Sequence, residues 1–154
     1  GATVLFEAGT ERGLDNDLWA IPFAGGAKPT AYVQTAGRQS KAQFSPDGRW
    51  ATALNANKLE LVDIGSGTVT VLASDARLSV WSPDSRRVLF NTAGSTYQVV
   101  IGTGKVTLLY SGFRGVQDWT SDGLLVWQNN QLGLMPAPDE NATGPLPVMP
   151  KPLG

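Results

Sequence analysis

FSPDGRW stands at Phe44–Trp50, and this phrase returns twice along the chain. It reads WSPDSRR at Trp81–Arg87 and, more loosely, WTSDGLL at Trp119–Leu125. The aspartate of the phrase recurs after 37 and then 38 residues, at Asp47, Asp84 and Asp122. Repetition at a fixed period of this size predicts a repeat architecture in which each copy contributes one structural unit.

Short strand-like segments lie on both sides of each phrase, at similar spacing in each repeat, and are alternating in polarity or rich in β-branched residues. In the first complete repeat they lie at 42–44, 50–54, 59–63 and 69–72, and in the second at 78–81, 88–90, 97–101 and 106–110. The third repeat offers 116–119, 124–127 and 131–135. Four strands in a unit of this length predict an all-β fold, a β-propeller of four-stranded antiparallel blades.

The two ends of the chain depart from the full repeat. Segments 4–6, 18–23 and 30–34 match the second to fourth strands, so the first repeat lacks its inner strand. A last outer strand is expected near 145–149, at a sheet edge or absent, because prolines cannot donate in a central strand. We expect one domain over residues 1–154, with about four blades in an open arc or in part of a larger ring. The repeats are placed at about 1–35, 36–74, 75–112 and 113–150.

The composition argues against several classes of function and of site. A net charge of −1 with 16% charged residues gives no basic surface for nucleic acid. Without cysteine or histidine the chain has no Ser-His-Asp triad and no metal site built on those residues. Glu11, Asp15 and Asp17 lack the glycine and terminal glutamate of a calcium loop. The longest uncharged run, 88–104, contains too many polar residues to span a membrane. We therefore expect no enzyme activity, no metal, no cofactor and no membrane insertion.

The repeated phrase is interpreted as a turn between the two inner strands of each blade. Pro46 presets the backbone, the aspartate accepts local N–H groups, and Gly48 takes a positive φ. Ser85 replaces that glycine in the second copy and is expected to strain the turn or change its type. A serine–aspartate pair that recurs in a chain without histidine favours this structural role over catalysis. The tryptophans of the strand patterns are expected in the core: Trp50, Trp81, Trp119 and Trp127.

One set of polar residues remains as a candidate binding site. The loops between blades share a face with the loops joining each second and third strand. That face is expected to carry three arginines, one per inter-blade loop, with polar residues further out: Arg38, Arg77, Arg114, Asn55 and Lys58. Guanidinium groups suit a carboxylate or phosphate, which points to a protein or peptide partner or an anionic small ligand. The alternative, that these loops are charged because they are solvated, stays open.

The phrase, its following strand and the glycine-bearing hairpin resemble the TolB-type, WD40-like propeller repeat, closely over 42–110 and loosely at the flanks. The Gly-His and Trp-Asp pairs of WD repeats are absent. The resemblance implies a bacterial protein, periplasmic or otherwise extracytoplasmic, with a cytoplasmic location left open. It also implies a non-catalytic protein-interaction or ligand-sensing module.

Two further readings accompany this hypothesis. One is an accessory, substrate-filtering propeller of a prolyl oligopeptidase- or tricorn-like hydrolase, whose Gly-x-Ser-x-Gly catalytic elbow is not in this sequence. A self-contained glycosidase is disfavoured because few carboxylates fall at the expected axis. Exposed apolar flanks of an open arc also predict a homodimer as one way to complete a ring.

Overall fold

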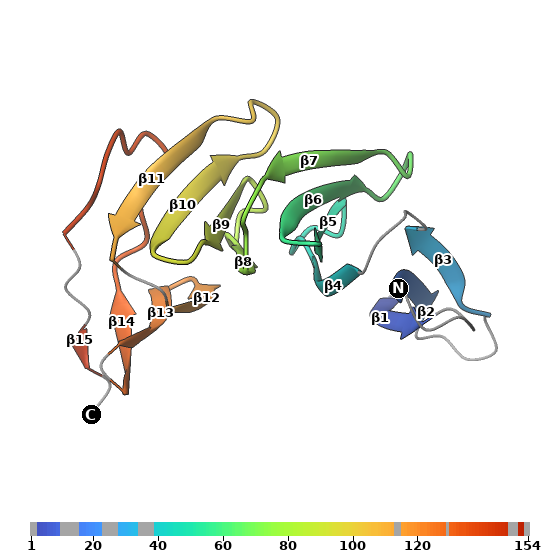
Figure 1. Ribbon diagram of the computed structural model, residues 1–154, viewed down its shortest axis with the longest axis horizontal. Helices are drawn as coiled ribbons and strands as arrows, with labels where there is room; N and C mark the ends of the chain where they lie inside the picture. The colour runs from blue at the N-terminus through green and yellow to red at the C-terminus, as the bar shows by residue number, and fades with distance from the viewer. Residues whose placement is uncertain are drawn as a thin grey trace. The chain divides into compact units, whose positions relative to one another are not determined.

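The computed structural model describes residues 3–9, 16–22, 28–33, 39–112, 115–128, 130–147 and 151–152. Every regular element in these ranges is a β-strand, and all strand pairs are antiparallel (Figure 1). No helix among them is long and apolar enough to cross a membrane. The chain divides into two compact units, Gly1–Ser74 and Asp75–Gly154, which are described separately.

The first unit holds two sheets. The N-terminal sheet has three strands in the order β1 (Thr3–Gly9), β2 (Asn16–Pro22) and β3 (Thr30–Val33). The next has four, in the order β4 (Gln39–Phe44), β5 (Trp50–Asn55), β6 (Lys58–Asp63) and β7 (Val69–Ala73). The three-stranded first sheet is what a repeat beginning at its second strand predicts.

The second unit holds two four-stranded sheets. The third sheet contains β8 (Leu78–Trp81), β9 (Arg87–Asn91), β10 (Ser95–Val100) and β11 (Val106–Ser111). The fourth contains β12 (Val116–Thr120), β13 (Gly123–Gln128), β14 (Gln131–Met135) and β15 (Lys151–Pro152). The all-β fold of four-stranded antiparallel sheets is therefore confirmed.

One apolar core joins the third and fourth sheets. Residues of both sheets contribute to it: Val80, Leu89, Leu109, Tyr110, Val116, Trp119, Leu124, Val126 and Met135. Side-chain alternation along β13 explains which of its residues belong to this core: Leu124 and Val126 do, while Leu125 between them does not. Burial of a large apolar side chain stabilises a fold by about 1.5–3 kcal/mol, so this cluster accounts for the packing of neighbouring blades.

The last strand lies at a sheet edge, as predicted, but later in the chain than expected. Residues 145–147 form no strand, and the outer strand β15 comes later, at Lys151–Pro152, paired only with Gly133 and Leu134. The second and third sheets join their third and fourth strands through hairpins at Gly65–Gly67 and Gly102–Gly104, as predicted. In the fourth sheet, residues 136–147 are the described part of the β14–β15 connection. Its backbone bonds with the third sheet, described below, replace a local hairpin.

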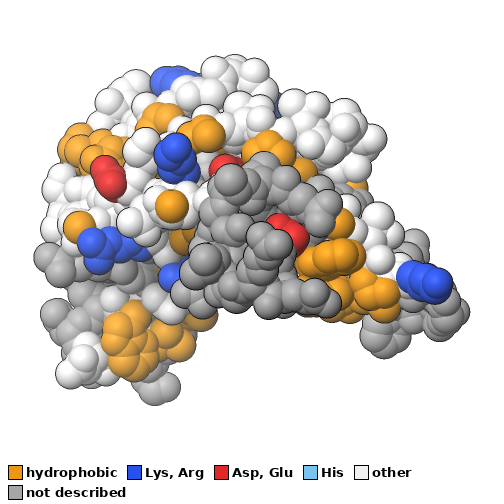
Figure 2. Space-filling model, turned by 45° about the vertical axis from the view of Figure 1, so that its right-hand side comes forward, with side chains coloured by type: hydrophobic (Ala, Val, Ile, Leu, Met, Phe, Trp, Pro, Cys, Tyr) orange, Lys and Arg blue, Asp and Glu red, His pale blue; other side chains and the backbone are white. Residues whose placement is uncertain are grey.

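Trp127 is the second departure, because its side chain is 51% exposed while Trp81 and Trp119 are buried. It pairs with Leu132 across β13 and β14, on the sheet face opposite the core residue Val126. Val4, Val71 and Val106 are likewise about half exposed. Figure 2 shows hydrophobic side chains reaching the surface in separate groups. The strand pattern thus placed Trp127 correctly in β13 but did not predict that the residue is exposed.

Candidate functional site

The first copy of the repeated phrase forms a closed turn. The Ser45 N–H donates to the Trp50 carbonyl, and the Gly48 N–H donates to the Ser45 carbonyl, both at 2.9 Å. The Ser45 hydroxyl donates to Asp47 Oδ1 at 2.6 Å and accepts the Trp50 N–H at 3.0 Å. Asp47 Oδ1 also accepts the Arg49 N–H at 3.1 Å. Serine and aspartate are thus both used inside the turn.

The second copy repeats the same bonds. The Ser82 hydroxyl donates to Asp84 Oδ1 at 2.5 Å and accepts the Arg87 N–H at 2.9 Å, while Asp84 accepts the Arg86 N–H. Burial raises the pKa of the Asp84 carboxyl, but these hydrogen bonds and the nearby arginine charges outweigh it and hold the pKa below its ordinary value. An aspartate held ionised by its own turn is a structural group and lacks a proton to donate.

Ser85 adopts the same left-handed backbone as its glycine counterpart, with φ at +61° against +72° for Gly48. The turn therefore keeps its type and carries the strain that the substitution predicts. In the third copy the geometry loosens: the Asp122 N–H donates to the Thr120 hydroxyl, which itself donates to the Gly123 carbonyl. All three phrases act as connections between neighbouring strands.

The predicted arginine row is only partly visible. Arg38 and Arg114 lie outside the described residues, as do Glu11 and Asp15. Arg77 is exposed in the second unit, and its backbone N–H donates to the Asn91 carbonyl at 2.8 Å. The approach of three arginines to one point stays a prediction.

The structure places Asn55 and Lys58 together, as a directly paired couple at the end of the β5–β6 hairpin. Between them Ala56 and Asn57 both have positive φ, at 46° and 67°, which gives the tight two-residue loop of a twisted hairpin. Lys58 is exposed, whereas Asn55 is 8% exposed. This end of the sheet lies opposite the Ser45–Asp47 turn, because β5 runs from one to the other.

Glu60 is a residue of this hairpin that the sequence interpretation missed. Its Oε1 accepts the Asn55 Nδ2–H at 3.0 Å, and the residue is only 6% exposed. Its Oε2 is buried without a hydrogen-bond partner. In the sequence Glu60 appears only as a polar residue within an apolar strand, and the structure shows that its neighbours Leu59, Leu61 and Val62 are all buried. The hairpin therefore presents an exposed cation beside a buried carboxylate.

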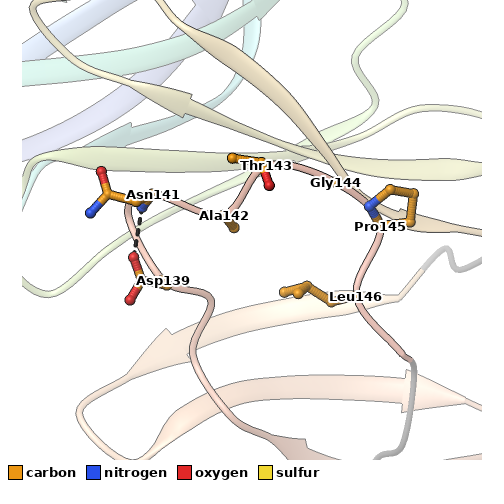
Figure 3. Close-up of a pocket in the computed structure, with 7 residues that line it drawn as sticks. All are labelled: Asp139, Asn141, Ala142, Thr143, Gly144, Pro145 and Leu146. Atoms are coloured by element: carbon orange, nitrogen blue, oxygen red, sulfur yellow. Dashed lines mark hydrogen bonds between the residues drawn. The ribbon is translucent and has the colours of Figure 1, made fainter.

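A surface depression of about 560 Å³ lies on the β14–β15 connection. It is lined by Asp139, Asn141, Ala142, Thr143, Gly144, Pro145 and Leu146. Figure 3 shows Leu146 pointing into the space that the segment encloses and the Asn141 side chain pointing away from it. Asp139 Oδ1 accepts the Asn141 N–H at 2.7 Å, so the one carboxylate among the lining residues is engaged in a local turn. None of the predicted site residues lines this depression.

No protein-family model and no curated protein matches the sequence. Solved structures do match. A putative TolB from Agrobacterium tumefaciens has 21% identity and a TM-score of 0.69, over 88% of this chain and 58% of that one. TolB from Acinetobacter baumannii has 14% identity and a TM-score of 0.68, over 86% of this chain and 38% of that one. The tricorn protease has 17% identity and a TM-score of 0.64, over 92% of this chain and 15% of that one.

These likenesses concern the fold, because every identity lies below 25%. The chain spans about two fifths to three fifths of the length of the two TolB structures. Its antiparallel four-stranded sheets, their hairpins and their turn phrase agree with that architecture. The chain has a TolB-like β-propeller fold.

Proposed function

We propose that this chain is a non-catalytic binding module that recognises a protein or peptide partner with the loop ends of its blades. The observation that carries the proposal is the β5–β6 hairpin, where exposed Lys58 lies next to the buried pair Asn55 and Glu60. Exposed charge beside buried polar groups is suited to recognition of a polar ligand, and loops on a rigid sheet are a common place for it.

The opposite ends of the strands support the same conclusion by elimination. Ser45 and Ser82 donate to their own aspartates and accept backbone N–H groups, which leaves these hydroxyls committed to turns. A nucleophilic serine needs a neighbouring base rather than an ionised turn aspartate. A TolB-like fold adds a bacterial, extracytoplasmic setting to the proposal, and Arg38, Arg77 and Arg114 stay predicted contributors to binding.

A second candidate function is the accessory propeller of a hydrolase. The likeness to the tricorn protease favours it, because 92% of this chain matches one part, 15%, of that larger protease. In this case the hairpin ends would select peptides for a separate catalytic domain. The two candidates differ in the neighbouring domains of the gene product: a Gly-x-Ser-x-Gly elbow on an α/β domain favours the hydrolase.

Selection from a displayed peptide library tests the binding face. Peptides that bind the wild-type chain are compared on a loop-end variant in which four basic residues are changed: Arg38→Ala, Lys58→Ala, Arg77→Ala and Arg114→Ala. The matched control changes two exposed arginines of the turn phrases, Arg49→Ala and Arg86→Ala. We expect affinity to fall at least about tenfold in the first variant and to persist in the second. Equal affinity for all three proteins contradicts the proposal.

A further inference from the structure

Glu60 differs from its neutral counterpart in the third sheet. There the Thr96 hydroxyl donates to Asn91 Oδ1 at 2.8 Å, and Asn91 Nδ2 donates to the Val116 carbonyl at 3.4 Å. In both sheets an asparagine ending the second strand bonds a side chain five residues later. By register Thr96 corresponds to Lys58, and the counterpart of Glu60 is Gln98, two residues further on. Gln98 is 1% exposed, and its Oε1 is likewise buried without a hydrogen-bond partner. The third sheet thus has a neutral side chain at this place, so the fold does not require a carboxylate there.

A carboxylate in that position is costly. Glu60 is 6% exposed, one oxygen receives a single amide hydrogen bond, and the other has no partner. Leaving one buried polar atom unpaired costs about 1–3 kcal/mol, and more for a charged group. Glutamine, as at Gln98, would remove the charge, which is the larger part of that cost. A charged group that is present although it lowers the stability of the fold points to a ligand that donates to Oε2.

The strand register defines what lies beside the carboxylate. Glu60 pairs with Ala53 on β5 and with Val71 on β7, so the three side chains share one face of the sheet. Ala53 is fully buried, but Val71 is 54% exposed. Lys58, two residues before Glu60, lies on this same face and is exposed. The carboxylate is therefore bordered by an open apolar side chain and by a cation.

We propose that Glu60 is the subsite for a basic side chain, arginine or lysine, of a peptide partner. The cationic head donates to Glu60 Oε2, and the alkyl stem lies along Val71. Because Oε2 is covered in the free protein, entry requires a small movement of the side chains around it. Lys58 then faces a carbonyl or carboxylate of the same peptide. This inference rests on the proposed binding function and names the ligand chemistry of its site.

Titration with N-acetylarginine amide, followed by ¹H–¹⁵N NMR, tests the proposal. N-acetylcitrulline amide, which has the same shape without the charge, is the matched probe. We expect saturable shifts of the Asn55 side-chain amide with the arginine probe, and binding at least about tenfold weaker with citrulline or in Glu60→Gln. Val71→Ser should weaken binding about threefold through the stem alone. Asp122→Asn, which removes an exposed carboxylate elsewhere, should bind as wild type does.

The thermal midpoint of Glu60→Gln separates a ligand role from a structural one. Removal of an unpaired charge should leave Tm equal to or above that of the wild type. A lower Tm, equal binding of the citrulline probe, or undiminished arginine binding by Glu60→Gln overturns the inference. If the arginine probe fails while selected peptides still depend on Lys58 and the loop arginines, the ligand assignment is wrong and the proposed function stands.

Discussion

The guanidinium carbon of Arg87 lies 4.7 Å from the centre of the Trp119 ring, which joins the third sheet to the fourth. The same guanidinium donates from Nη1 to the Pro138 carbonyl at 2.8 Å, and its Nη2 lies 3.5 Å from Asp84 Oδ2. Trp119 is 5% exposed, so the cation covers a ring that is otherwise part of the core. One side chain thus connects a turn, a neighbouring sheet and the β14–β15 connection.

Arg87→Ala should destabilise the chain by about 1–3 kcal/mol, because it removes a cation–π contact and a hydrogen bond to a carbonyl. Urea unfolding followed by tryptophan fluorescence measures the loss. Arg86→Ala is the control: that side chain is 66% exposed and its 3.6 Å pair with Glu140 is solvated, so the change should stay below about 1 kcal/mol. Equal losses for the two variants would contradict this account of Arg87.

Gly115→Ala should destabilise far more than Gly94→Ala. A Cβ at Gly115 would stand 2.1 Å from the Trp127 carbonyl oxygen, a backbone atom that cannot move aside alone. Overpacking of this kind typically costs about 1–3 kcal/mol or more. At Gly94 nothing lies within 4 Å of the added atom. Thermal unfolding of the two variants gives the comparison, and a Tm of Gly115→Ala near the wild-type value would refute the close approach.

Gly48→Ala should cost about 1 kcal/mol through the backbone alone, since φ is +72° and the added Cβ meets nothing within 4 Å. Gly48→Asn should cost less, because asparagine tolerates the left-handed region better. Chemical denaturation of both variants checks the order. A larger loss for asparagine than for alanine would show that strain at this turn is not the cause.

Acid should remove the stability that Asp84 provides. Its native pKa lies below the ordinary value of 3.8, so above that value the ionised, hydrogen-bonded form stabilises the fold. As the pH falls through 3.8 towards the native pKa, the unfolded chain binds the proton first and the contribution is lost. Asp84→Asn should therefore show a smaller drop in unfolding free energy between about pH 6 and pH 3. An unchanged pH profile would count against this role.

The four sheets could be predicted from the sequence because their signals are local. The turn phrase, the alternating strands and the glycine hairpins each lie within one repeat. The position of β15 could not be predicted in this way. Residues 136–147 bond to Arg87, Gln98 and Leu109, which lie far away in the sequence, and no local pattern encodes those contacts.

The candidate site could likewise be predicted from the sequence only in part. Asn55 and Lys58 follow from the hairpin signal, because a short loop between two strands fixes which residues end them. Glu60 does not follow, because strand alternation assigns a lone polar residue to the solvent side. Its burial depends on packing over both faces of β6, where Leu59 and Val62 are fully buried. Packing of that kind is a tertiary property.

The β14–β15 connection has a consequence for how the second unit unfolds. Carbonyls at Pro138, Asp139 and Glu140 accept from Arg87 and Gln98, and the Leu146 N–H donates to the Leu109 carbonyl at 2.6 Å. These bonds tie a loop of the fourth sheet to three elements of the third. In repeat proteins cooperativity comes from the interfaces between neighbouring repeats. We therefore expect these bonds to couple the two blades, so that the third and fourth sheets unfold in one transition.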